Sequence, residues 1–170
     1  TEHHYSHVWE MTLLRNGRSA ILHGAKVGVA TVLVAALYEQ MGRLSRPEVV
    51  DRLESASLPD RRQETAQIRA AYGELAEQIE REQAPFLALD ADRFDGLKAQ
   101  ILNHWPTIQA IAAQVPPTQT IAALLQQVGG PVAVQGLGLA AADQTFVEQN
   151  AHYLRNRFTV RKLARVLGVE

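Results

Sequence analysis

One segment decides the fold of this chain, His23–Gly42, with the sequence HGAKVGVATVLVAALYEQMG. Apolar residues fall on nearly all faces of a helix drawn through it, Val29, Val32 and Leu37 among them. A helix that is apolar all round is typically buried, so the segment predicts the centre of a helical bundle. Its apolar run, Val27–Leu37, is shorter than the ~20 residues that a transmembrane helix needs. A buried core helix is therefore expected rather than a membrane span.

The composition favours further helices around this centre. The 170 residues suit a single domain, and 46% hydrophobic with 21% charged residues is the balance of a globular protein. A net charge of −1 gives no reason to expect nucleic acid or an anionic membrane as partner. The chain has no cysteine, which excludes a disulfide framework and thiolate metal ligands and fits a reducing, cytoplasmic compartment. The polar, His-rich start does not read as a signal peptide.

The remaining helices are predicted from periodicity, caps and proline positions. They are expected at about residues 2–14, from 45 into the 50s, from 59 to just before Pro85, from Asp90 or Asp92 to 111, at 118–128 and, as one helix or a pair, at 140–167. Ser45 with Glu48 three residues later is a capping-box pattern. Pro106 predicts a kink or break, and residues 132–134 a loop. The expected fold is an all-α bundle of about seven helices.

Histidines mark the start of the chain and the start of the long helix. His3 and His7 are four residues apart, which places them on one face of a helix. His23 opens the central segment and could meet them around one metal ion. Catalytic zinc sites use three protein ligands and keep one position open. Either signal alone is more simply explained by a solvated helix end, a tag remnant or a helix cap, so the prediction depends on the combination.

Together these stretches resemble a known metal site. EHHYSHVWEM (residues 2–11) followed by LHGAKVGV (22–29) resembles the iron-containing alcohol dehydrogenase and dehydroquinate synthase superfamily, and within it the bacterial-type sn-glycerol-1-phosphate dehydrogenases. YLRNRFTV (153–160) is similar to the entry of that family's final helix, and residues 116–138 are similar to its late segment. The middle of the chain, about 45–113, is generic helix.

The resemblance implies a two-domain architecture and a ligand set. Residues 1–170 would be the C-terminal helical domain, and the N-terminal nucleotide-binding domain would be absent from this chain. A divalent metal, zinc with nickel and iron as alternatives, would be bound between the domains by His3, His23 and an Asp from the absent segment. His7 would face the substrate and relay a proton; His7 as ligand with His3 beside it is the alternative assignment. Ala25 departs from the Glu that many relatives carry after His-Gly, which removes a possible support for the ligand.

The resemblance also implies a reaction. An NAD- or NADP-dependent oxidoreductase would reduce dihydroxyacetone phosphate to sn-glycerol-1-phosphate for phospholipid biosynthesis, as a homodimer, and the isolated chain would be inactive. Lys26 and Arg18 are candidates for binding the substrate phosphate, with ordinary solvated side chains as the simpler alternative. Another polyol is the alternative substrate.

Two alternatives belong to other functional classes. Residues 159–169 resemble the first helix and turn of a helix-turn-helix, but no recognition helix follows in the sequence and the chain lacks a basic excess. The second alternative is a stand-alone helical metal-binding or scaffold module without catalysis. A Gly-rich βαβ pattern upstream of this chain would distinguish it from the dehydrogenase. Trp9 and Trp105 are expected to anchor the core or a domain interface.

Overall fold

The computed structural model describes residues 1–169, which form helices joined by turns and loops and contain no strand. The α-helices are α1 (Glu2–Arg15), α2 (His23–Arg43), α3 (Arg46–Ser55), α4 (Arg61–Tyr72), α5 (Ala76–Leu87), α6 (Ala91–Asn103), α7 (Trp105–Ala112), α8 (Thr118–Gln127), α9 (Ala141–Asn150) and α10 (Val160–Val166). Short 3₁₀-helices are η1 (Gly73–Leu75), η2 (Val134–Leu137) and η3 (Ala151–Tyr153). The all-α prediction is confirmed, and the expected number of about seven helices was too low.

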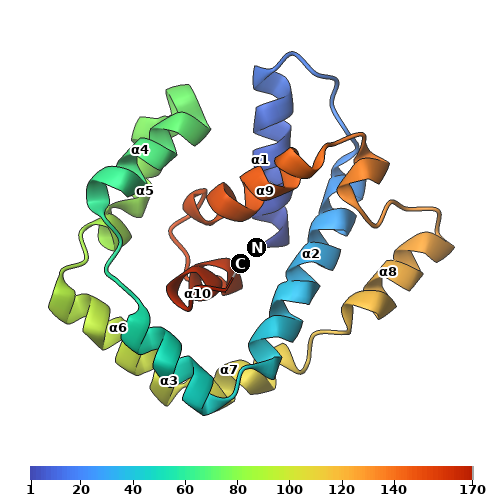
Figure 1. The fold of residues 1–170 in the computed structure, drawn as a ribbon. Helices are drawn as coiled ribbons and strands as arrows, with labels where there is room; N and C mark the ends of the chain where they lie inside the picture. The colour runs from blue at the N-terminus through green and yellow to red at the C-terminus, as the bar shows by residue number, and fades with distance from the viewer. Residues whose placement is uncertain (170) are drawn as a thin grey trace.

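Helix α2 holds the centre of the fold, as its apolar sequence predicts. It packs against α1, α7, α8 and α10, and Val29 and Ala30 are completely buried. Figure 1 shows α10 lying inside the ring that the other helices form, with α9 crossing beside α1. Trp9 and Trp105 are each 1% exposed, which confirms both as core residues.

Local signals set several helix ends where the sequence predicts them. Helix α1 ends at Arg15, with Asn16 as its C-cap. Helix α3 begins with a capping box, in which the backbone N–H of Glu48 donates to Ser45 Oγ and the backbone N–H of Ser45 donates to the Glu48 carboxylate. The predicted break before Pro106 is present, because α6 ends at Asn103 and α7 begins at Trp105.

The expected polar helix from residue 59 to just before Pro85 is wrong in two respects. It is divided at Gly73, whose φ of 55° lies in the left-handed region that favours glycine. Helices α4 and α5 therefore pack against each other as a pair. Pro85 does not end the helix but lies in the last turn of α5, where only one intrahelical hydrogen bond is lost.

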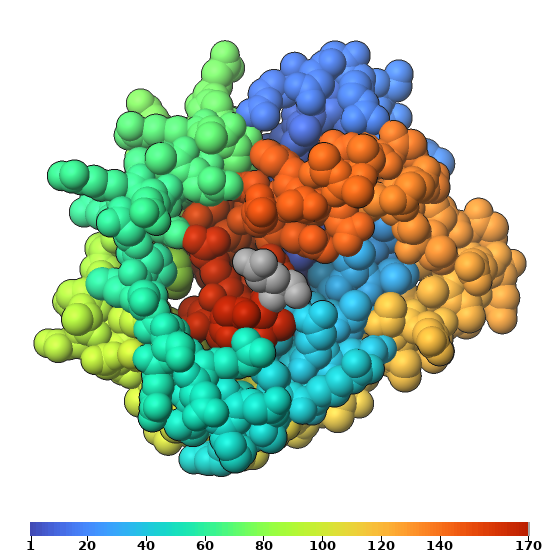
Figure 2. All heavy atoms as spheres, viewed as in Figure 1, coloured from blue at the N-terminus to red at the C-terminus, as the bar shows by residue number. Residues whose placement is uncertain are grey.

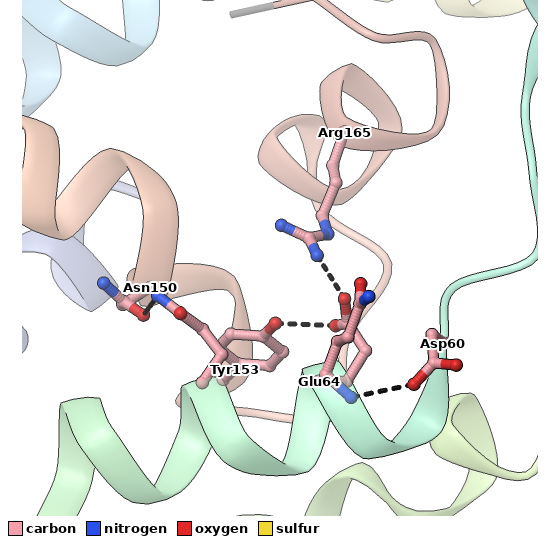
Figure 3. A network of polar contacts seen from close by, with 7 residues as sticks. Asp60, Glu64, Asn150, Tyr153 and Arg165 are labelled. Atoms are coloured by element: carbon pink, nitrogen blue, oxygen red, sulfur yellow. Dashed lines mark hydrogen bonds and ion pairs between the residues drawn. The ribbon is translucent and has the colours of Figure 1, made fainter.

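A buried polar network ties α4 to the C-terminal elements (Figure 3). Glu64 is 4% exposed, and its carboxylate accepts hydrogen bonds from the Tyr153 hydroxyl, at 2.6 Å, and from the Arg165 guanidinium. Burial and the contact with Glu64 raise the pKa of Tyr153. The Tyr72 hydroxyl donates to the backbone oxygen of Asn150 at 2.7 Å. These contacts hold η3 and α10 against α4.

A cleft of about 740 Å³ opens between the α3–α4 segment and α10 (Figure 2). It is lined in part by Asp51, Asp60, Glu64 and Arg165, and it contains none of the histidines of the predicted metal site. Within residues 1–169, no helix is both long enough and apolar enough to cross a bilayer.

Candidate metal and substrate site

Three imidazoles gather where the first two turns of α1 meet the first residue of α2. The ring centroids of His3 and His23 are 5.6 Å apart, those of His7 and His23 5.7 Å, and those of His3 and His7 6.4 Å. All three residues are exposed to solvent. The four-residue spacing on α1 and the position of His23 at the start of α2 therefore produce the cluster that the sequence predicts.

The rings are farther apart in this structure than a shared metal ion would hold them. Two imidazoles bound to one tetrahedral zinc ion have centroids roughly 5 Å apart, given Zn–N bonds of about 2.0–2.1 Å, and the three observed separations are slightly wider. Imidazole nitrogen is also a ligand that zinc, nickel and iron accept. Among residues 1–169, no group of three or more His, Asp or Glu side chains is arranged so that it could hold a metal ion. The donors suit a metal ion, and a further ligand is needed.

Ser6 lies next to one of the rings. Its side chain is completely buried, and its Oγ lies 3.4 Å from Nδ1 of His23. This contact engages Nδ1 and leaves Nε2 of His23 as the nitrogen that can face an ion. The neighbouring His4 is half-buried. Burial is the main cause that lowers the pKa of His4 to about 4, so its ring is neutral near pH 7.

The two side chains predicted to bind a substrate phosphate are both engaged with other residues. Arg18 follows the C-terminal end of α1, where its Nη2 donates to the backbone oxygen of Gly138 at 2.9 Å and its Nη1 lies 3.7 Å from Asp143. Lys26 is 0% exposed, and its Nζ lies 3.4 Å from Oε1 of Glu10. Each would have to leave its present partner to reach a phosphate.

Sequence analysis did not single out Glu10 as a site residue. Its two carboxylate oxygens face different partners: Oε1 lies 3.4 Å from Nζ of Lys26, and Oε2 lies 3.7 Å from Nδ1 of His7. The three-residue step from His7 to Glu10 on α1 is the only sequence signal for this contact. Lys26 lies on the other helix, so its approach to Glu10 depends on how α1 and α2 pack.

Comparison with known proteins identifies relatives along nearly the whole chain. A glycerol-1-phosphate dehydrogenase, NAD(P)+, of Geobacillus thermodenitrificans is 31% identical over 163 residues. Its namesakes from Halalkalibacterium halodurans and Geobacillus stearothermophilus are 30% and 29% identical over 159 and 163 residues. Each match covers 94% of this chain, and the chain spans about 30% of the length of these curated relatives.

No protein-family model matches the chain, and no solved structure gives a significant match. The relatives carry the name that the two histidine stretches and the 153–160 segment indicated. Over nearly its whole length the chain is therefore similar to about 30% of the length of these glycerol-1-phosphate dehydrogenases.

Proposed function

We propose that this chain is the helical part of a metal-dependent, NAD(P)-linked oxidoreductase that reduces dihydroxyacetone phosphate to sn-glycerol-1-phosphate. The convergence of His3, His7 and His23 carries the proposal, because three exposed imidazoles from two helices have ring centroids 5.6–6.4 Å apart, and zinc, nickel and iron all accept imidazole as a ligand. The names of the relatives support the reaction and the nicotinamide cofactor. Their greater length supports a nucleotide-binding domain elsewhere in the protein.

In this proposal His3 and His23 hold the metal ion together with a carboxylate from outside the chain. When bound, the metal would supply Lewis acidity to the substrate carbonyl and the nicotinamide would supply the hydride. His7 faces the substrate and donates the proton that the reduced oxygen requires, as an imidazole can near neutral pH. The centroid separations of 5.6 and 5.7 Å from His23 are so similar that His7 as ligand, with His3 as its neighbour, stays the alternative.

The remaining elements of the proposal rest on the family. Residues 1–170 would form one helical domain, and the enzyme would act as a homodimer in the cytoplasm and serve phospholipid biosynthesis. Lys26 and Arg18 stay predictions as phosphate ligands, since both are now engaged by acidic side chains. Zinc is the expected metal, with nickel and iron as alternatives.

The test is metal content and dihydroxyacetone phosphate-dependent NADH or NADPH oxidation in the intact protein. The variants are His3→Ala, His7→Ala and His23→Ala, with the exposed His104→Ala as control. We expect His3→Ala and His23→Ala to lose metal and activity, and His7→Ala to keep metal but lose rate. Metal loss in His7→Ala with retention in His3→Ala would exchange the two roles. Full metal retention in every variant, with no nucleotide oxidation by the wild type, would favour a helical scaffold module instead.

A further inference from the structure

Beneath the imidazole cluster, one carboxylate joins a buried cation to an exposed ring. Glu10 Oε1 lies 3.4 Å from Nζ of Lys26, and Glu10 Oε2 lies 3.7 Å from Nδ1 of His7. The exposed fraction of the side chain rises along this chain of contacts, from 0% for Lys26 to 40% for Glu10 and 51% for His7. The contacts therefore lead from the protein interior to the surface where the three rings meet.

The buried charge of Lys26 stabilises the present position of Glu10. Within residues 1–169 its ammonium group makes no hydrogen bond, and Glu10 is its ion-pair partner. A buried ammonium group is costly unless an opposite charge compensates it. Moving the carboxylate away would leave that charge uncompensated, so Glu10 is fixed more firmly than a surface glutamate 40% exposed would otherwise be.

We propose that Glu10 is a positioning residue that sets the tautomer and orientation of His7. A carboxylate beside Nδ1 favours the tautomer with the proton on Nδ1. That tautomer leaves the lone pair of Nε2 free to accept a proton or bind a metal ion. The 3.7 Å separation is about 0.5 Å beyond the hydrogen-bond range, so a hydrogen bond forms only when the exposed ring or the carboxylate moves closer by that amount. Lys26 acts through Glu10, whose carboxylate its charge compensates in this structure.

The assignment holds for either role of His7. A ring that binds metal uses the lone pair of Nε2, whereas a ring that donates a proton from Nε2 must carry protons on both nitrogens. In both cases Glu10 would hold the proton on Nδ1. The inference rests on the proposed function only for its kinetic measurement, because a tautomer can be observed in any folded form of the protein.

The experiment is ¹⁵N NMR of histidine-labelled intact protein without metal, at a pH where the rings are neutral. Signals of His7 are assigned by their loss in His7→Ala. We expect wild-type His7 to carry its proton on Nδ1, Glu10→Ala to shift it to Nε2, and Glu10→Gln to keep it on Nδ1, since the amide oxygen still accepts. Glu77→Gln, which removes one partner of an exposed ion pair with Arg81, is the control and should change nothing.

Stability is the main complication, because Glu10→Ala leaves the Lys26 charge buried alone. The double variant Glu10→Ala/Lys26→Met removes both charges and gives the same tautomer measurement if the single variant does not fold. In the metal-loaded enzyme we expect Glu10→Ala to lower kcat/KM about ten-fold and Glu10→Gln to restore most of it. An Nδ1 proton on His7 that persists in both Glu10→Ala proteins overturns the inference, whatever the enzyme does. If wild-type protein binds no metal and oxidises no nucleotide, the proposed function fails while the tautomer result stands.

Discussion

Removing Glu10 alone should destabilise the protein, whereas removing it together with Lys26 should not. In Glu10→Ala the ammonium group of Lys26 stays buried at 0% exposure and loses the carboxylate 3.4 Å away. Removing one partner of a buried ion pair is strongly destabilising, but replacing the pair with apolar residues is often neutral. Lys26→Met keeps most of the side-chain volume and removes the charge. The four proteins, wild type, two single variants and the double variant, form a thermodynamic cycle.

The structure limits the size of the effect. Two unit charges 3.4 Å apart interact with about 5 kcal/mol at an effective dielectric constant near 20 and about 1 kcal/mol in bulk water. Lys26 is fully buried, but the Glu10 side chain is 40% exposed, so solvent screens part of the interaction. We expect Glu10→Ala to cost about 2–3 kcal/mol and Lys26→Met less than about 1 kcal/mol. The coupling energy between the two positions should be about 2 kcal/mol.

The assay is urea unfolding of the intact protein, followed by far-ultraviolet circular dichroism in all four variants. The transition midpoint should fall most in Glu10→Ala and recover in the double variant. Glu77→Gln, at an exposed ion pair, should leave the free energy of unfolding within about 0.5 kcal/mol of wild type. Additive single-variant effects, with a double variant no more stable than Glu10→Ala, would refute the claim that Lys26 depends on Glu10.

Three further predictions concern positions away from the site. Gly73→Ala should cost about 1–2 kcal/mol because residue 73 has a φ of 55°, while Gly96→Ala, inside α6 with no atom near the added methyl group, should gain about 0.5–1 kcal/mol; urea midpoints test both. Tyr153→Phe removes a hydrogen bond to the buried Glu64 and should cost about 1–3 kcal/mol in the same assay. Burial first, and nearby Arg and Lys side chains second, hold the pKa of His152 well below its usual value; its stabilising contribution is therefore present above pH ~6.5 and lost as the pH falls. His152→Phe should flatten the decline in unfolding free energy between about pH 6.5 and pH 5, and an unchanged slope would contradict this.

The features that could be predicted from the sequence are those set by local signals. The all-round apolar pattern of residues 23–42 predicts the central helix because burial follows from composition alone. The Ser45–Glu48 pair predicts its own cap because both partners lie within one turn. The gathering of His3, His7 and His23 was predicted from helical spacing and family resemblance, and the ring separations agree with it.

The features that could not be predicted depend on packing between helices. Gly73 interrupts a sequence that otherwise continues as a polar helix, and its positive φ reflects the way α4 and α5 fold onto each other. Lys26 was expected near the surface, since most lysines are exposed. Its burial follows from the position of α2 at the centre of the fold, which places the position three residues after the exposed His23 in the interior.

That burial has a consequence for metal binding, and it gives the last prediction. Lys26 is three residues from His23 on α2, so its positive charge lies beneath the surface where a divalent cation would bind. An uncompensated ammonium group there would repel the ion, and the Glu10 carboxylate, 3.4 Å away, offsets it. Glu10→Ala should therefore weaken zinc binding relative to wild type, while Glu10→Ala/Lys26→Met, which has the wild-type net charge, should bind zinc close to normally. Isothermal titration at low and high salt distinguishes this electrostatic effect from a structural one. The defect of Glu10→Ala should shrink as salt rises if charge is the cause, and a defect that persists equally in the double variant would assign Glu10 a direct structural role at the site instead.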